Sequence, residues 1–153
     1  MLEAGAKAPS FALDDVAGAR QELSDILSRG PALIALYKVS CPVCQMTLPY
    51  LERIAGGSLQ IIAVSQDDER DTRRFSEAYR MTIPTLLDRA KAGYPVSNAF
   101  GISRVPSLFL VEQDGAISLA SEGFVKRDLE AIGQRAGVAP FRPEDNVPEW
   151  KAG

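Results

Sequence analysis

The residues Ser40-Cys41-Pro42-Val43-Cys44 hold both cysteines of the chain, separated by only two positions. The run that precedes them, Ala32-Leu33-Ile34-Ala35-Leu36-Tyr37, is apolar and has the length of a strand. After the cysteines, apolar residues recur at the spacing of a helix, at Met46, Tyr50, Leu51 and Ile54. The cysteine pair is therefore predicted to lie where a buried strand ends and a helix begins.

This position favours redox chemistry of the two thiols. The start of a helix carries unpaired backbone N–H groups and the positive end of the helix dipole, and both stabilise a thiolate. We expect Pro42 at the first helical position and Cys41 as the partly exposed residue that caps it. Cys44 would lie one turn further along, on the same side and less exposed. A disulfide between the two closes a very small loop and adds little stability, which favours a bond that opens and closes.

A zinc site and a chance spacing are the two alternatives to a redox-active cysteine pair. A structural zinc site is disfavoured, because it needs about four Cys or His ligands, and the chain has two cysteines and no histidine. Two inert buried cysteines that fall at this spacing by chance remain an alternative. We therefore expect no metal, and no cofactor apart from a redox-active disulfide between Cys41 and Cys44.

Length and charge limit the possible partners. The 153 residues fit one domain with a sizeable core, and we expect a monomer. The net charge of −3 disfavours nucleic acid and anionic membranes as partners. No stretch approaches a transmembrane span, and Met1 to Ser10 lack the basic and apolar regions of a signal peptide. A cytoplasmic location is expected for the chain as written, with a periplasmic or other extracytoplasmic location as the alternative for a trimmed exported protein.

Strand and helix patterns alternate along the chain. Phe11 and Leu13 indicate a short first strand. The later patterns predict strands at 32–39, 59–64, 83–88, 107–111 and 116–120, and helices at 21–27, 42–55, 68–80, 94–100 and 125–136. Strand–helix–strand alternation implies parallel pairing, and the Asp114-Gly115 hairpin adds an antiparallel strand. The prediction is an α/β fold with a central mixed sheet flanked by helices. Residues 139–153 contain three prolines and no period, so we expect an extended C-terminal tail that Trp150 docks.

A Cys-x-x-Cys at a strand-to-helix junction inside this order of elements resembles thioredoxin. The resemblance is closer to the TlpA-like branch, which includes thiol–disulfide oxidoreductases of cytochrome c maturation. The opening Gly5…Ala8-Pro9-x-Phe11-x-Leu13 is similar to the start of TlpA-like proteins and of the related AhpC/TSA redoxins and peroxiredoxins. Residues 83–102 resemble the strand-helix segment that these groups insert into the minimal core. The resemblance implies a thioredoxin-like redox domain at residues 1–138, with an N-terminal extension.

Val105-Pro106-Ser107, just ahead of a predicted strand, resembles the cis-proline of this superfamily. The resemblance implies that Val105 and Pro106 face the cysteine pair and bind substrate. The exposed backbone of Val105 would pair with an extended substrate segment. The alternative is an ordinary trans proline that opens a strand.

The sequence also departs from the thioredoxin pattern. Ser40 stands where thioredoxins usually have Trp. The buried acid that helps to deprotonate the second cysteine is missing at both usual places, which hold Ala35 and Thr47. Thr47 or a water molecule would have to relay the proton, although a threonine hydroxyl is a poor base. We expect Pro42, Val43 and Thr47 to tune the site, and the Pro-Val pair resembles the Pro-x pairs of some exported oxidoreductases.

The resemblance implies a thiol–disulfide oxidoreductase that exchanges electrons between a Cys41–Cys44 dithiol and protein disulfides, with an unidentified electron donor and a role in cell redox homeostasis or antioxidant defence. The first alternative is a peroxiredoxin-like peroxidase with Cys41 attacking peroxide. It is disfavoured because the Pro-x-x-x-Thr-x-x-Cys pattern is absent, with Ile34 and Lys38 at the two positions ahead of Cys41. A redox-sensing module without turnover is the second alternative, suggested by the missing acid.

Overall fold

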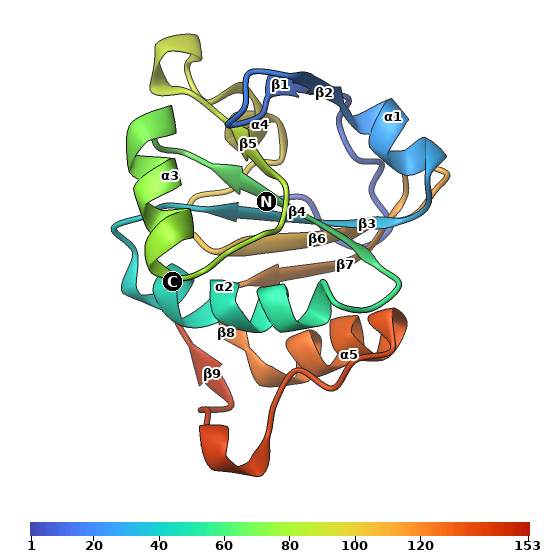
Figure 1. Cartoon of the computed structure of the whole chain (residues 1–153). Helices are drawn as coiled ribbons and strands as arrows, with labels where there is room; N and C mark the ends of the chain where they lie inside the picture. The colour runs from blue at the N-terminus through green and yellow to red at the C-terminus, as the bar shows by residue number, and fades with distance from the viewer.

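A five-stranded mixed sheet runs through the centre of the computed structural model, which describes residues 1–153 (Figure 1). Its strand order is β5-β4-β3-β6-β7. β3, β4 and β5 pair in parallel, whereas β6 is antiparallel to β3 and β7 is antiparallel to β6. The bounds are β3 Ala32–Tyr37, β4 Gln60–Ser65, β5 Thr85–Leu87, β6 Ser107–Val111 and β7 Ile117–Glu122. The predicted mixed sheet is confirmed.

The central strand β3 is buried on both faces. Each of its six residues is at most 1% exposed. The side chains of Leu33, Ala35 and Tyr37 enter one hydrophobic cluster, whereas those of Ala32, Ile34 and Leu36 enter the other. An uninterrupted apolar run is what a strand covered on both faces needs, because neither set of alternate side chains meets water.

Helices form a layer on each face of the sheet (Figure 1). α2 (Pro42–Ile54), α3 (Glu69–Ala78) and α5 (Lys126–Ala136) contribute to the cluster on one face. α1 (Leu23–Ser28) and α4 (Pro95–Ala99) contribute to the cluster on the other face. None of these helices has the length and apolar character needed to cross a membrane.

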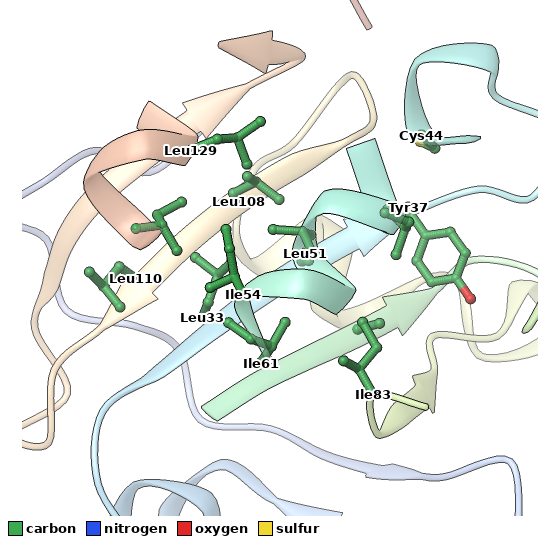
Figure 2. Close-up of a cluster of buried hydrophobic side chains, with 14 of the residues drawn as sticks. Leu33, Tyr37, Cys44, Leu51, Ile54, Ile61, Ile83, Leu108, Leu110 and Leu129 are labelled. Atoms are coloured by element: carbon green, nitrogen blue, oxygen red, sulfur yellow. The ribbon is translucent and has the colours of Figure 1, made fainter. Parts of the chain in front are cut away.

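The hydrophobic cluster between the sheet and helices α2, α3 and α5 has one end beside the cysteine pair. Figure 2 shows Leu51 and Ile54 of α2 above Leu33 and Ile61 of the sheet, with Cys44 at one end of the group. Leu51 and Ile54 are fully buried. The apolar stripe of α2 therefore fixes the helix on the sheet and sets the depth at which Cys44 lies.

The N-terminal extension is a hairpin rather than a single strand. β1 (Ala12–Asp14) pairs antiparallel with β2 (Arg20–Glu22), and α1 follows directly at Leu23. The expected helix start at residue 21 is therefore wrong by two positions. The side chain of Asp15 explains the turn, because one carboxylate oxygen accepts the backbone N–H groups of Ala17 and Ala19, both at 2.9 Å.

Residues 139–153 run back across the molecule. After a 3₁₀ turn at Pro143–Asp145, the chain forms β9 (Trp150–Lys151), which pairs antiparallel with β8 (Phe124–Val125). We expected Trp150 to dock this segment, but Trp150 is 63% exposed. Its backbone, not its ring, makes the contact.

The upstream half of the same segment is held by side chains. Arg53 of α2 forms an ion pair with Asp145, with Nη1 and Oδ2 2.7 Å apart, and Nη1 also donates to the carbonyl oxygen of Pro140. The ring of Phe141 packs edge-on against that of Tyr50, with centroids 4.9 Å apart. These contacts fix the segment as far as its 3₁₀ turn. The division of the chain at residue 138 stays a prediction.

Shortening Leu51 is expected to weaken the core between α2 and the sheet. We expect Leu51→Ala to lower the free energy of unfolding by about 2–5 kcal/mol, because it removes buried methyl groups and leaves a cavity. Urea denaturation would measure the change. Glu130→Ala, on the exposed side of α5, serves as the control and should change stability by less than about 0.5 kcal/mol. A loss of similar size in both variants would contradict the placement of Leu51.

Candidate active site

The two sulfurs lie at the start of α2. Cys41 is the N-cap residue, and its Sγ accepts the backbone N–H of Cys44 at 3.1 Å. Pro42 occupies the first turn, where a missing N–H leaves no bond unmade. Both cysteines are free thiols; Cys41 is half-buried and Cys44 is fully buried. The expected positions and the expected difference in exposure are confirmed.

The turn between β3 and α2 is fixed by hydrogen bonds to its backbone carbonyl oxygens. The N–H of Cys41 donates to the carbonyl oxygen of Lys38 at 3.2 Å. The side-chain amide of Gln45, one turn into α2, donates to the carbonyl oxygen of Val39 at 2.9 Å. Cys41 is thus held from both sides, by the strand end before it and by the helix after it.

The loop before β6 reaches the exposed sulfur. The Val105–Pro106 peptide bond is cis, as expected. The thiol of Cys41 donates to the carbonyl oxygen of Val105, with 3.4 Å between Sγ and oxygen. Pro106 is buried and Val105 is half-buried. The structure therefore brings the four residues Cys41, Cys44, Val105 and Pro106 together, although 64 positions separate Cys41 from Val105.

The environment of Cys44 keeps its thiol protonated. Burial is the main cause that raises the pKa of Cys44, and its hydrogen bond with Cys41 raises it further. The negative charge of Asp67 acts in the same direction, whereas a hydrogen bond with the Lys38 backbone opposes it. Burial likewise raises the pKa of Tyr37 to about 12, so this neighbour of the site stays neutral near pH 7.

Asp67 is the acidic residue of the site that the sequence analysis missed. It follows β4, and its Oδ2 accepts the backbone N–H of Val39 at 2.8 Å, just ahead of the cysteine pair. A signal was present in the sequence, because parallel neighbouring strands end at the same edge of a sheet. An acid just after the predicted strand 59–64 was therefore a candidate neighbour of the cysteines.

The remaining expected site residues have structural contacts. The hydroxyl of Thr47 is buried and donates to the carbonyl oxygen of Val43 within α2, at 2.7 Å, and makes no hydrogen bond with either sulfur. Val43 is 7% exposed and packs in the core cluster. Pro42 is exposed. Nothing in these contacts supports Thr47 as a proton relay, and tuning by Pro42 and Val43 stays a prediction. No group of three or more His, Cys, Asp or Glu side chains is arranged to hold a metal ion.

Residues 4–120 match the AhpC/TSA family. The chain belongs to this family. Among the relatives of this AhpC/TSA-family chain is thiol-disulfide oxidoreductase ResA of Halalkalibacterium halodurans, 29% identical over 122 residues, which cover 76% of this chain and 67% of the relative. ResA of Geobacillus thermodenitrificans is 26% identical over 138 residues, or 84% of this chain and 77% of the relative.

Solved structures share the fold of this AhpC/TSA-family chain. The thioredoxin domain of a thiol-disulfide oxidoreductase from Bacteroides vulgatus superposes with a TM-score of 0.77 at 22% identity, covering 88% of this chain and 98% of that one. Peroxidoxin BcpB from Mycobacterium tuberculosis gives a TM-score of 0.72 at 22% identity, covering 89% and 94%. These structures show the shared fold, and the family match together with the ResA relatives confirms a TlpA-like member of the thioredoxin superfamily.

Neutralising Asp67 is expected to make Cys44 easier to deprotonate. In Asp67→Asn the pKa of Cys44 should fall, because the nearby negative charge is lost while the amide oxygen can still accept the Val39 N–H. The change should be small beside the effect of burial, which is the largest cause of the raised pKa. The ultraviolet absorbance of the thiolate, followed against pH in a Cys41→Ser background, would measure it.

Asp68→Asn is the matched control for this titration. Asp68 caps α3 through a carboxylate that accepts the Asp71 N–H, and asparagine caps equally well. The control should leave the pKa of Cys44 unchanged. Equal shifts in the two variants would contradict a specific effect of Asp67.

Proposed function

We propose that this chain is a thiol–disulfide oxidoreductase in which Cys41 attacks protein disulfides and Cys44 resolves the intermediate. One observation carries the assignment. The half-buried sulfur of Cys41 has a backbone N–H donor at 3.1 Å, and a second, fully buried free thiol lies one helical turn away. The relatives named thiol-disulfide oxidoreductase ResA support the same reaction class.

In the first step the Cys41 thiolate attacks one sulfur of a substrate disulfide. A bond forms between Cys41 Sγ and that sulfur, the substrate S–S bond breaks, and the second substrate sulfur leaves as a thiolate. Cys41 is the attacking residue because Cys44 is fully buried. The Cys44 N–H donor lies where negative charge on the Cys41 sulfur has to be stabilised.

In the second step Cys44 loses its proton and attacks Cys41 Sγ. The Cys41–Cys44 bond forms and the mixed disulfide breaks, so the remaining substrate sulfur leaves as a thiolate. Solvent receives the proton of Cys44 and protonates both substrate sulfurs, which leaves the substrate with two thiols. The substrate has gained two electrons and the protein has lost two. An external dithiol must return them before the next cycle, and the same steps in reverse would oxidise a substrate dithiol.

The loop at Val105 is the proposed contact for the substrate backbone. Its carbonyl oxygen lies 3.4 Å from the attacking sulfur, so an extended segment that bonded to this loop would have its disulfide next to Cys41. Protein disulfides are therefore the proposed substrates. The dithiol donor, the monomeric state and the cytoplasmic location stay predictions of the sequence.

Peroxidase activity is the weaker candidate, although the fold is shared with a peroxidoxin. Lys38 stands three residues before Cys41, where the peroxidase pattern requires a threonine hydroxyl, and its side chain is exposed. Its backbone carbonyl accepts the Cys41 N–H. The hydrogen bonds of the Cys41 sulfur are with the Val105 carbonyl and the Cys44 N–H, and none is with a side-chain hydroxyl.

Insulin reduction by dithiothreitol tests the proposed function. The wild-type protein should accelerate the precipitation of the insulin B chain, whereas Cys41→Ser should not, because the attacking sulfur is gone. Cys44→Ser should instead accumulate mixed disulfides with its substrates, since the resolving thiol is gone. Failure of the wild type to accelerate the reaction would overturn the proposal, and peroxide consumption far above that of a free thiol would favour the peroxidase.

The resolving step is expected to speed up with pH. Because burial raises the pKa of Cys44 above its ordinary value, only a small fraction is thiolate near neutrality. That fraction should grow about tenfold for each pH unit up to about pH 9. Reaction with 5,5′-dithiobis(2-nitrobenzoate) separates the steps, since attack by Cys41 releases one coloured thiol and resolution by Cys44 a second. A second phase that is independent of pH would contradict the assignment of Cys44.

A further inference from the structure

The last residues of the chain lie against the loop that we assign to substrate. β9 pairs with β8 in the register Val125 with Trp150 and Phe124 with Lys151. The chain then continues to Gly153, where an added Cβ would lie 2.3 Å from the carbonyl oxygen of Val105 and 2.9 Å from its carbonyl carbon. In Figure 1 the end of the chain lies beside the start of α2, where Cys41 caps the helix.

Gly123 provides the space for this approach. Its φ is +78°, and an added Cβ would lie 2.5 Å from the carbonyl oxygen of Lys151 and 3.1 Å from the nitrogen of Gly153. The N–H of Gly123 donates to the carbonyl oxygen of Pro106 at 2.8 Å. A side chain at residue 123 would prevent the close contact, so the edge next to Pro106 is shaped to receive a strand of backbone.

The hold on this segment weakens toward its end. Upstream, the Arg53–Asp145 ion pair and the rings of Phe141 and Tyr50 fix the chain. Further on, the N–H of Lys126 donates to the carbonyl oxygen of Glu149 at 3.0 Å. From residue 149 onward every residue is exposed. Apart from the ion pair of the exposed Glu149 side chain with Lys126, at 3.5 Å, only backbone contacts hold residues 149–153, and none of their side chains is buried. Such a segment has low local stability, so residues 149–153 can leave while the upstream half stays in place.

We propose that residues 149–153, the covering segment, occupy in the free protein the edge at Val105 and Gly123 where an extended substrate segment binds, and that substrate displaces them. The inference rests on the proposed function, because it concerns access to the same site. The covering segment contains no cysteine, so it occupies the edge without reacting. It also leaves Cys41 half-exposed, so a small disulfide reaches the sulfur without displacing it.

Substrate binds only those molecules in which the edge is free. Its apparent affinity is therefore the intrinsic affinity multiplied by the fraction of such molecules. Variants that open the edge should therefore lower KM for a protein disulfide and leave kcat unchanged. In Gly153→Val the added side chain would collide with the Val105 carbonyl, so the end of the covering segment has to move away. A chain that ends at Pro148 removes the segment altogether. None of residues 149–153 belongs to either hydrophobic cluster.

For both variants we expect KM for insulin to fall by about threefold to tenfold. The rate with 5,5′-dithiobis(2-nitrobenzoate), which needs no backbone pairing, should not change. Ala152→Val is the matched control, because it places a valine at the neighbouring, exposed position of the covering segment. Unchanged KM in both opened variants would overturn the inference, and so would a raised KM, which would mean that the segment helps to bind substrate.

Trp150 supplies a second measurement, because it is the only tryptophan of the chain and lies in the covering segment. In Cys44→Ser, a mixed disulfide between Cys41 and an extended peptide should lower the fluorescence anisotropy of Trp150. A mixed disulfide with 2-mercaptoethanol should leave it unchanged. Equal anisotropy with both adducts would overturn displacement. If the wild type reduces neither insulin nor the small disulfide, the proposed function fails instead, and the two failures remain distinct.

Discussion

The burial of β3 on both faces is the constraint on which the site depends. A strand whose six side chains all avoid water needs a helix over each face, and α2 is the helix that starts where β3 ends. Its apolar stripe fixes it above Leu33 and Ile61 (Figure 2). The first turn of α2 therefore lies at the rim of the sheet, so that Cys41 meets solvent while Cys44 closes one end of the core. The different roles of the two sulfurs follow from this difference in depth.

The same rim also collects the loops that surround the pair. β4 is parallel to β3, so the residues after β4 reach the end of β3, and Asp67 among them bonds to Val39. β6 is antiparallel, so its beginning lies at this rim, with Ser107 opposite Leu36. Val105 arrives at the Cys41 sulfur for that reason. Mixed sheet topology thus explains why residues distant in sequence meet at one thiol.

The parts of the fold that depend on local pattern could be predicted from the sequence. The apolar run 32–37 followed by two cysteines and a helical stripe indicated the junction, and the resemblance at Val105-Pro106 indicated the cis bond that the structure contains. The pairing of β8 with β9 left no such signal, because two-residue strands have no period and Trp150 is exposed. Asp67 was missed because its role comes from a long-range hydrogen bond. Gln21 was assigned to a helix because only the Asp15 turn reveals the hairpin.

The unequal burial of the two sulfurs also determines how the pair withstands oxidants. Peroxide that oxidises Cys41 converts it to a sulfenic acid, the first and reversible stage of cysteine oxidation. The Cys44 thiol, one turn away and shielded from the same reagent, condenses with that group, forms the disulfide and releases water. Because the resolving thiol lies one turn away, the reversible disulfide competes with irreversible oxidation of Cys41 to sulfinic acid, and reduction of that disulfide restores both thiols.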